Sequence, residues 1–221
     1  MPLPDQAVNA KPCRYAGFQK LDSLHDACDR TGYVVSWTKL WKGAFTMSQV
    51  LEQIKNRRSI RKYKPDEVPQ ELLDQIIEAG LYAASGKNLQ SAIIIQVTNK
   101  DLRDEISRMN AQIMGRPEGH DPFYGAPAML IVLGKKDQPN HVVDGSLVMG
   151  NLMLAAHELG LGSCWINRAK EEFDTQWGRD LLKSLGIEGE YEGIGHCALG
   201  YIDGEVPNAA PRKEGRVFYI K

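Results

Sequence analysis

The pattern of hydrophobic and polar positions in this 221-residue chain changes near Met47. Up to residue 46 the sequence mixes prolines, charges and scattered aromatic residues without a sustained helical or strand period, whereas the residues after Ser48 are strongly patterned. We therefore predict an N-terminal extension of residues 1–46, outside the fold, followed by a compact domain of residues 47–221. An ordered arm that wraps the domain is the alternative, since disordered segments seldom carry so many aromatic residues.

Helical and strand-like patterns alternate along the predicted domain. Apolar residues at helical spacing predict helices at 48–57, 69–81, 102–114, 142–159 and 175–185. Continuous apolar runs predict buried strands at 92–97, 128–133, 163–166 and 194–201, and a Gly/Pro loop is expected at 115–127. Strands separated by helices indicate a mixed sheet that helices cover on both faces.

The helix predicted at 142–159 is apolar on all sides, so it has no face suited to water. Either it is the central helix of a large domain, or it packs on its own sheet with one face and on a second subunit with the other. In a domain of this size a symmetric dimer is the better interpretation.

Composition narrows the classes of partner. The formal net charge is −1 and 43% of residues are hydrophobic, which favours a globular core and argues against nucleic acid as the main ligand. The cysteines Cys13, Cys28, Cys164 and Cys197 lie far apart without metal-like spacing, as in reduced cytosolic proteins, and no metal site is expected. No apolar stretch is long enough for a membrane span and no signal pattern is present, so we expect a soluble cytoplasmic protein.

A cluster of basic and hydroxyl side chains follows the first predicted helix, and it consists of Arg57, Arg58, Ser59 and Arg61. Guanidinium and hydroxyl donors suit a phosphate, and a planar guanidinium can also face the edge of a planar heterocycle. Taken alone, such a cluster more often marks a solvated helix end, where cations interact favourably with the helix dipole.

Two further polar segments stand between predicted elements. Ser85, Asn88 and Gln90 offer neutral donors and acceptors that suit the amide-like edge of a ligand, although a helix C-cap at Gly86 with ordinary turn residues is the simpler explanation. Near the C-terminus, Arg212 belongs to a short basic segment that by itself indicates only a surface turn.

With these three segments in this order, residues 47–221 resemble the FMN-dependent nitroreductase family. The matching motifs are Arg-Arg-Ser-Ile-Arg-Lys-Tyr at 57–63, the Ser-x-x-Asn-x-Gln turn at 85–90, the strand at 126–132, the apolar helix leading into Gly-Leu-Gly-Ser-Cys-Trp-Ile at 160–166, Leu-Gly-Tyr at 199–201 and Pro-Arg-Lys at 211–213. The resemblance implies an α+β fold, a three-layer α/β/α sandwich with a central mixed, mostly antiparallel sheet.

The resemblance also implies a cofactor and a site. Arg57, Ser59 and Arg212 would contact the FMN phosphate and ribityl chain, Arg58 would flank the ribityl chain, and Arg61 would face the pyrimidine edge of the flavin. Ser85, Asn88 and Gln90 would reach FMN from the partner subunit of a homodimer, so that FMN lies at the subunit interface. The backbone around Trp165, Ile166 and Asn167 would approach the flavin N5.

The implied activity is the reduction of nitroaromatic, quinone or related small-molecule acceptors by ping-pong hydride transfer from NADH or NADPH, with no catalytic side chain. Arg168, which stands where the family often has another residue beside N5, and Tyr124, in the 115–127 loop, are predicted to contact substrate. The alternative for Arg168 is a solvent-facing arginine that pairs with Glu171 or Glu172 in the following helical turn. Part of that loop, 115–124, could serve as a lid, although a solvated connection is the commoner role. A flavin-storage protein, and a reductive dehalogenase or a dehydrogenase of the same fold, remain alternatives.

Overall fold

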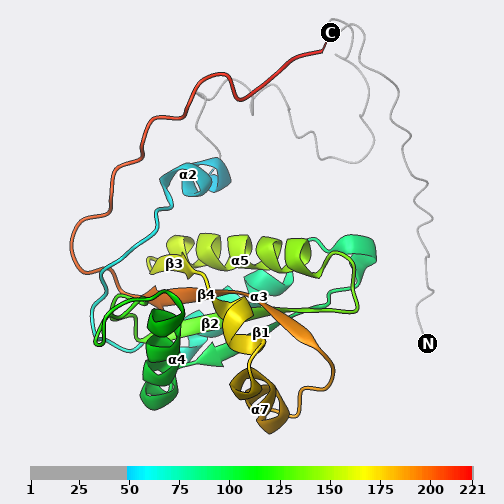
Figure 1. The fold of residues 1–221 in the computed structure, drawn as a ribbon. Helices are drawn as coiled ribbons and strands as arrows, with labels where there is room; N and C mark the ends of the chain where they lie inside the picture. The colour runs from blue at the N-terminus through cyan, green and yellow to red at the C-terminus, as the bar shows by residue number, and fades with distance from the viewer. Residues whose placement is uncertain (1–48, 221) are drawn as a thin grey trace, which may run out of the picture. The chain divides into compact units, whose positions relative to one another are not determined.

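The computed structural model describes residues 49–220 (Figure 1). The predicted extension, together with Cys13 and Cys28, lies outside the described residues. The elements follow one another as α2 (Gln49–Asn56), α3 (Gln70–Leu81), the 3₁₀ helix η1 (Gly86–Asn88), β1 (Ala92–Val97), α4 (Lys100–Ile113), β2 (Ala128–Lys135), α5 (His141–Glu158), β3 (Gly162–Ile166), α6 (Ala169–Phe173), α7 (Gln176–Ser184) and β4 (Tyr191–Gly200).

The described strands form one sheet in the order β1-β2-β4-β3, and each neighbouring pair is antiparallel. The parallel part of the expected mixed sheet is limited, among the described residues, to an isolated bridge between Ser59 and Ser163. This bridge attaches the segment after α2 to β3, the last strand in the sheet order. The strand β2 is buried along almost its whole length because it lies in the middle of the sheet and helices cover both faces.

Helices pack on both faces of the sheet, which gives the three predicted layers (Figure 1). Alternate residues of β2 point to opposite faces. Leu130 and Val132 pack with α3 and α5, whereas Met129 and Ile131 belong to the core on the side of α4, α6 and α7. The prediction of an α+β sandwich is confirmed.

All the predicted helices and strands are present, with shifts at their ends. The strand predicted at 194–201 begins earlier, at Tyr191, where polar residues and glycine hid it from an apolar-run criterion. The sequence patterns did not predict α6 or η1, which are each about one turn long. The interpretation of Gly86 as a helix C-cap is wrong, because α3 ends at Leu81 and Gly86 begins η1.

The helix α5 divides its apolar residues between two sides. Val148, Met149 and Leu152 are buried on the sheet side, whereas Val143 and Leu147 are 62% and 47% exposed. Leu152 therefore belongs to the core of this chain, and a charge placed there would disrupt the core before it could test a dimer. Among residues 49–220, no helix is both long and apolar enough to cross a membrane.

Candidate functional site

The segment that carries the basic cluster lies along β3 and the end of β4. The backbone amide of Ile60 donates to the carbonyl of Ser163 at 2.9 Å, next to the Ser59–Ser163 bridge. Further along, the amide of Lys64 donates to the carbonyl of Tyr201 at 2.9 Å. The cluster is thus fixed by backbone hydrogen bonds to the sheet, which is more order than a frayed helix end provides.

Two guanidinium nitrogens of this cluster are buried without a partner in the described part of the chain. They are Nη1 of Arg57 and Nε of Arg58, while Nη1 of Arg58 donates to the carbonyls of Lys55 and Arg57 at 2.6 and 2.7 Å. A buried, unpaired N–H of a charged group costs about 1 to 3 kcal/mol or more, so an acceptor is expected there. An anion with several oxygens fits this requirement.

The neighbourhood of the cluster is electropositive. Burial lowers the pKa of His157, in the last turn of α5, and the charges of Arg57 and Arg58 lower it further. Cys164 of β3 is surrounded by the same cluster: burial raises the pKa of its thiol, while Arg61, Ser59 and Arg57 act in the opposite direction. Arg57, Ser59 and Arg61 therefore all act on a residue of β3, the strand to which Ser59 is bridged.

The turn at 85–90 is held in an unusual backbone conformation. The carboxylate of Asp144, in the first turn of α5, accepts the amide of Gly86 at 3.0 and 3.1 Å. Ser85 Oγ accepts the amide of Gln90 at 3.0 Å, and Gln90 Nε2 donates to Asn88 Oδ1 at 3.0 Å. Three residues of the turn, Lys87, Asn88 and Gln90, have positive φ angles of 52°, 55° and 48°. Strain of this kind is often retained at binding sites.

Within one chain, this turn and the basic cluster lie at opposite ends of α5. Asp144 binds the turn, and the pKa of His157 is lowered by the nearby charge of Arg57. At a rise of 1.5 Å per residue, these two residues of α5 are about 20 Å apart along the helix. The structure thus brings Arg57, Arg58, Ser59 and Arg61 together along β3, but it does not bring Ser85, Asn88 or Gln90 to them.

The end of β3 leads from the core to an exposed turn. Trp165 is half-buried with its indole nitrogen unpartnered among the described residues, Ile166 is buried, and Asn167 and Arg168 are exposed. Arg168 has a φ of 86° and its guanidinium pairs with Glu171 at 2.7 Å. The predicted substrate contact is therefore engaged in a surface ion pair, which is weak in water.

Beneath this turn lies a buried polar cluster that the sequence patterns did not reveal. Asn110 Nδ2 donates to the carbonyl of Asn167 at 2.8 Å and to Glu172 Oε1 at 2.9 Å, and Glu172 Oε2 lies 2.8 Å from His196 Nε2. The one available signal is a histidine among the apolar and glycine residues at 193–200, and this signal alone points to no partner.

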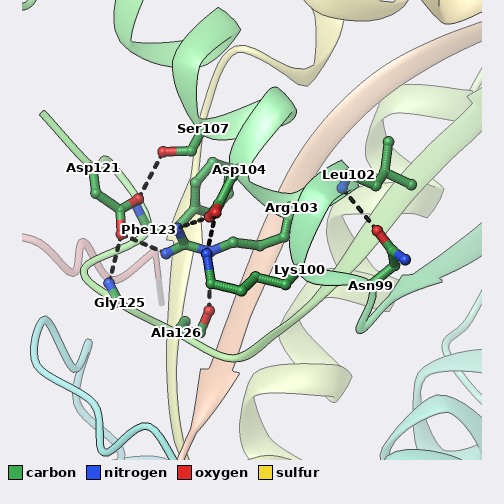
Figure 2. A network of polar contacts seen from close by, with 10 residues as sticks. All are labelled: Asn99, Lys100, Leu102, Arg103, Asp104, Ser107, Asp121, Phe123, Gly125 and Ala126. Carbon is green, nitrogen blue, oxygen red and sulfur yellow. Dashed lines mark hydrogen bonds and ion pairs between the residues drawn. The ribbon is translucent and has the colours of Figure 1, made fainter. Parts of the chain in front are cut away.

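A second polar network fixes the C-terminal half of the 115–127 loop (Figure 2). Its centre is the carboxylate of Asp121, which accepts from Arg103, from Ser107 Oγ at 2.8 Å, and from the amides of Phe123 and Gly125 at 2.9 and 2.7 Å. Burial alone would raise the pKa of Asp121, but these hydrogen bonds, led by the one from Arg103, lower it. The loop is therefore built around an ionised aspartate.

This network limits what the loop can do. Phe123 is fully buried, with its ring edge-on to His196 at 5.2 Å, so it belongs to the core and not to a lid. Tyr124, the predicted substrate contact, is 37% exposed and has a φ of 57°. A movable lid would have to come from residues 115–120, which precede the network.

The C-terminal segment keeps Arg212 away from other described groups. Its guanidinium donates to the carbonyl of Ala210 at 3.2 and 2.7 Å, and residues 204–220 are exposed. The hydrophobic end of the segment consists of Val217, Phe218, Tyr219 and Ile220, all at least 66% exposed. The structure does not place Arg212 with Arg57, which leaves the predicted second phosphate contact without support from one chain alone.

Comparison with known proteins adds to this geometry. The model of the Nitroreductase family matches residues 54–201. A provisionally named NADH dehydrogenase/NAD(P)H nitroreductase of Methanothermobacter thermautotrophicus is 37% identical over 132 residues, which are 56% of this chain and 63% of that relative. The chain thus spans less than two thirds of that protein.

Solved structures resemble the fold over a larger share. A nitroreductase with bound FMN from Bacteroides fragilis superposes with a TM-score of 0.72 and 31% identity, covering 78% of this chain and 99% of that one. An iodotyrosine deiodinase bound to FMN and 3-iodo-L-tyrosine superposes with a TM-score of 0.63 and 25% identity, covering 78% and 99%.

Proposed function

This chain belongs to the nitroreductase family, and from that premise we propose that it is an FMN-dependent oxidoreductase that uses NADH or NADPH to reduce nitroaromatic, quinone or related small-molecule acceptors. The observation that carries the proposal is the buried, unpartnered Nη1 of Arg57 on a segment fixed to β3. A single terminal phosphate would satisfy this nitrogen and the neighbouring Nε of Arg58 with charge-assisted hydrogen bonds.

The residues along β3 fit the remaining parts of FMN. Ser59 would donate its hydroxyl to the phosphate or ribityl chain, and the exposed Arg61 would place positive charge at the pyrimidine edge. The backbone of Ile166 and Asn167 would lie at the flavin edge, where β3 leaves the core. Bound FMN supplies hydride transfer between NAD(P)H and the acceptor, so no protein nucleophile is required.

A homodimer with FMN at the interface completes the proposal. Its support is an apolar stripe on α5 that consists of the exposed Val143 and Leu147 and the half-buried Leu154, together with the separation of the 85–90 turn from the basic cluster of the same chain. A second copy that covers this stripe would bring its own Ser85, Asn88 and Gln90 to the first copy's FMN. Its exposed tail, with Arg212, would supply the second phosphate cation.

The purified protein tests this function directly. We expect it to be yellow, to release FMN and not FAD on denaturation, and to oxidise NADH or NADPH in the presence of a quinone or nitroaromatic acceptor. A protein that takes up no FMN after reconstitution would overturn the proposal. Bound FMN without any NAD(P)H oxidation would support a flavin-storage role instead.

A reductive dehalogenase is the second candidate, because the iodotyrosine deiodinase shares this fold at 25% identity. The network around Asp121 speaks against a large closing lid over a halogenated amino acid, since it fixes half of the loop. Release of iodide from 3-iodo-L-tyrosine by the reduced protein, at a rate exceeding quinone reduction, would favour this candidate.

A further inference from the structure

The turn at 166–168, in which Asn167 and Arg168 are exposed, rests on a polar cluster that is fully shielded from solvent. Asn110, Glu172 and His196 each have 0% relative exposure and come from α4, α6 and β4. Burying such groups costs free energy unless they are paired, so a cluster of this kind in an apolar layer needs an explanation. The cluster lies directly under the proposed flavin edge, and this position suggests that it supports the turn there.

The amide of Asn110 has a defined orientation. Its Nδ2 faces two acceptors, the carbonyl of Asn167 at 2.8 Å and Glu172 Oε1 at 2.9 Å, while its Oδ1 is buried without a partner in the described chain. A flipped amide would direct Oδ1 at two oxygens, which is repulsive. The carboxylate of Glu172 therefore selects the orientation in which Asn110 donates to the turn.

His196 holds Glu172 from the other side. Its Nε2 lies 2.8 Å from Glu172 Oε2, close enough for an ion pair, although the angle departs from that of a hydrogen bond. The ring of Phe123 meets the imidazole edge-on at 5.2 Å. His196 therefore lies against the side of Glu172 that Asn110 does not contact, with the ring of Phe123 packed on the imidazole.

The same face of α4 also holds the loop that carries Tyr124. Arg103, Ser107 and Asn110 follow one another at a spacing of four and three residues, so they share one face of the helix. Arg103 and Ser107 bind Asp121, whose carboxylate shapes the backbone before Tyr124 (Figure 2). One buried polar face therefore positions both exposed loops for which substrate contacts are predicted.

The turn needs such support because Arg168 adopts a φ of 86°. A residue other than glycine in a sparsely populated region costs about 1 to 3 kcal/mol, and it stays there only when its surroundings fix it. The hydrogen bond from Asn110 acts on the residue immediately before Arg168. This side-chain hydrogen bond from α4 holds the backbone of the turn from the side of the core.

We propose that Asn110 is a positioning residue, oriented by Glu172 and His196, that fixes the 166–168 turn against the flavin edge. The proposal rests on the proposed FMN-dependent function, since it assigns this turn to the edge of that cofactor. A turn held in place would present its backbone at a constant distance from the flavin, and misplacement by about 1 Å can lower a rate by one to two orders of magnitude.

The first test measures the turn itself, without any cofactor. In the apo protein, Asn110→Ala should accelerate exchange of the Glu172 amide, which donates to the carbonyl of Arg168 at 3.0 Å, by roughly fivefold to tenfold, as expected from the loss of about one hydrogen bond that holds the turn. The control is Asn99→Ala, which removes the N-cap of the same helix, where Asn99 Oδ1 accepts the amide of Leu102 at 2.9 Å. It should destabilise α4 by about 1 kcal/mol without changing exchange of the Glu172 amide.

The second test uses the FMN-loaded protein. Asn110→Ala should lower the rate constant of flavin reduction by NAD(P)H about tenfold and leave the Kd for FMN nearly unchanged, because the phosphate contacts are untouched. Asn110→Asp, which has the same shape but no N–H donor when ionised, should behave like the alanine variant. Glu172→Gln keeps an acceptor for Asn110 and should retain most of the parent rate.

The outcomes separate the two proposals. Equal exchange of the Glu172 amide in the Asn110 and Asn99 variants, or an unchanged reduction rate in Asn110→Ala, would overturn the positioning role while leaving the enzyme an FMN oxidoreductase. A parent protein that takes up no FMN would overturn the proposed function and, with it, the flavin part of this inference. The exchange rates would then still decide whether Asn110 holds the turn.

Discussion

Asp144 and Gly86 are joined by a hydrogen bond from the Gly86 amide to the Asp144 carboxylate, with both oxygens within 3.1 Å. It connects the first turn of α5 to the strained turn at 85–90. Asp144 is 5% exposed, so its carboxylate has little access to water and depends on such donors. This acid in the first turn of α5 therefore also anchors the 85–90 turn.

Replacing Asp144 should loosen the turn before it unfolds the domain. We expect Asp144→Ala to lower the free energy of unfolding by about 1 to 3 kcal/mol, because the Gly86 amide loses a charged acceptor. Asp144→Asn keeps an acceptor and should cost less. Chemical denaturation measures both. If the two variants lost equal stability, the hydrogen bond would not be the source of the effect.

Removing the proposed phosphate cations should weaken FMN binding. Arg57→Ala and Arg212→Ala should each lower the affinity by about 1.5 to 3 kcal/mol, roughly 10- to 100-fold, if each guanidinium makes a shielded, charge-assisted contact. Fluorescence titration with FMN measures this. Arg108→Ala, an exposed arginine on α4, is the matched control. If only Arg57→Ala lost affinity, Arg212 would not bind FMN. This result would agree with the structure of one chain, in which Arg212 lies apart from Arg57.

Sequence patterns predicted the strands well because buried runs such as Ala92–Val97 have a local signal. They did not predict α6, since a helix of one turn depends on tertiary contacts: here its Glu172 is buried against Asn110 and His196. The apolar residues on all sides of α5 likewise could not show which side meets the sheet: Leu152 is fully buried in this chain, whereas Leu147 is 47% exposed.

The candidate site likewise contains one part that the sequence revealed and another part that only the fold revealed. The cluster from Arg57 to Arg61 is contiguous in sequence, but its attachment to β3 had no signal there and is seen only in the fold. The polar face of α4 was invisible, because nothing in the spacing of Arg103, Ser107 and Asn110 distinguishes a buried polar stripe from a solvated one. Only the fold shows that their partners lie inside.

The dimer is best tested on the exposed side of α5. Leu147 is 47% exposed in one chain, and Leu147→Glu should place an unpaired carboxylate in the proposed interface, which would lower both dimer content and FMN occupancy. Light scattering and the flavin absorbance measure the two effects. Leu185→Glu, at a residue that is 51% exposed after α7, is the control. If the Leu147→Glu protein stayed dimeric, the interface would not lie on this side of α5.

Acid should act on the loop through Asp121. Its pKa is lowered in the folded protein, so its contribution to stability is complete above the unfolded value of about 3.9 and is lost as the pH falls through the lower folded value. Asp121→Asn should cost about 1.5 to 3 kcal/mol at pH 7 and lose less stability below about pH 4 than the parent. Unfolding curves between pH 7 and pH 2.5 measure this.

The control for this pH dependence is Asp174→Asn. Asp174 also has a lowered pKa, through its hydrogen bond with Lys170 and the contribution of Lys136, but these ion pairs are exposed. Exposed pairs contribute little, so this variant should follow the parent curve. Identical acid profiles for the parent and Asp121→Asn would remove Asp121 from the account of loop stability.

The last prediction concerns Arg168 and Glu171, whose side chains pair at 2.7 Å and are 45% and 43% exposed. Such a pair is worth at most about 1 kcal/mol, so an anionic ligand can compete with Glu171 for the guanidinium. If Arg168 binds substrate, Arg168→Ala should raise KM for a carboxylate-bearing nitroaromatic, or for NAD(P)H, about tenfold and leave a neutral quinone unaffected.

Glu171→Gln makes this prediction two-sided, because it releases Arg168 without removing it. The same anionic substrates should then show a KM that is lower than in the parent by up to about fivefold, the equivalent of about 1 kcal/mol. The double variant Arg168→Ala/Glu171→Gln should match Arg168→Ala, since the released charge is gone. Steady-state kinetics at low and high ionic strength would show both changes shrinking with salt. Parallel changes for charged and neutral substrates would instead leave Arg168 as a surface residue and acceptor selection to the shape of the pocket.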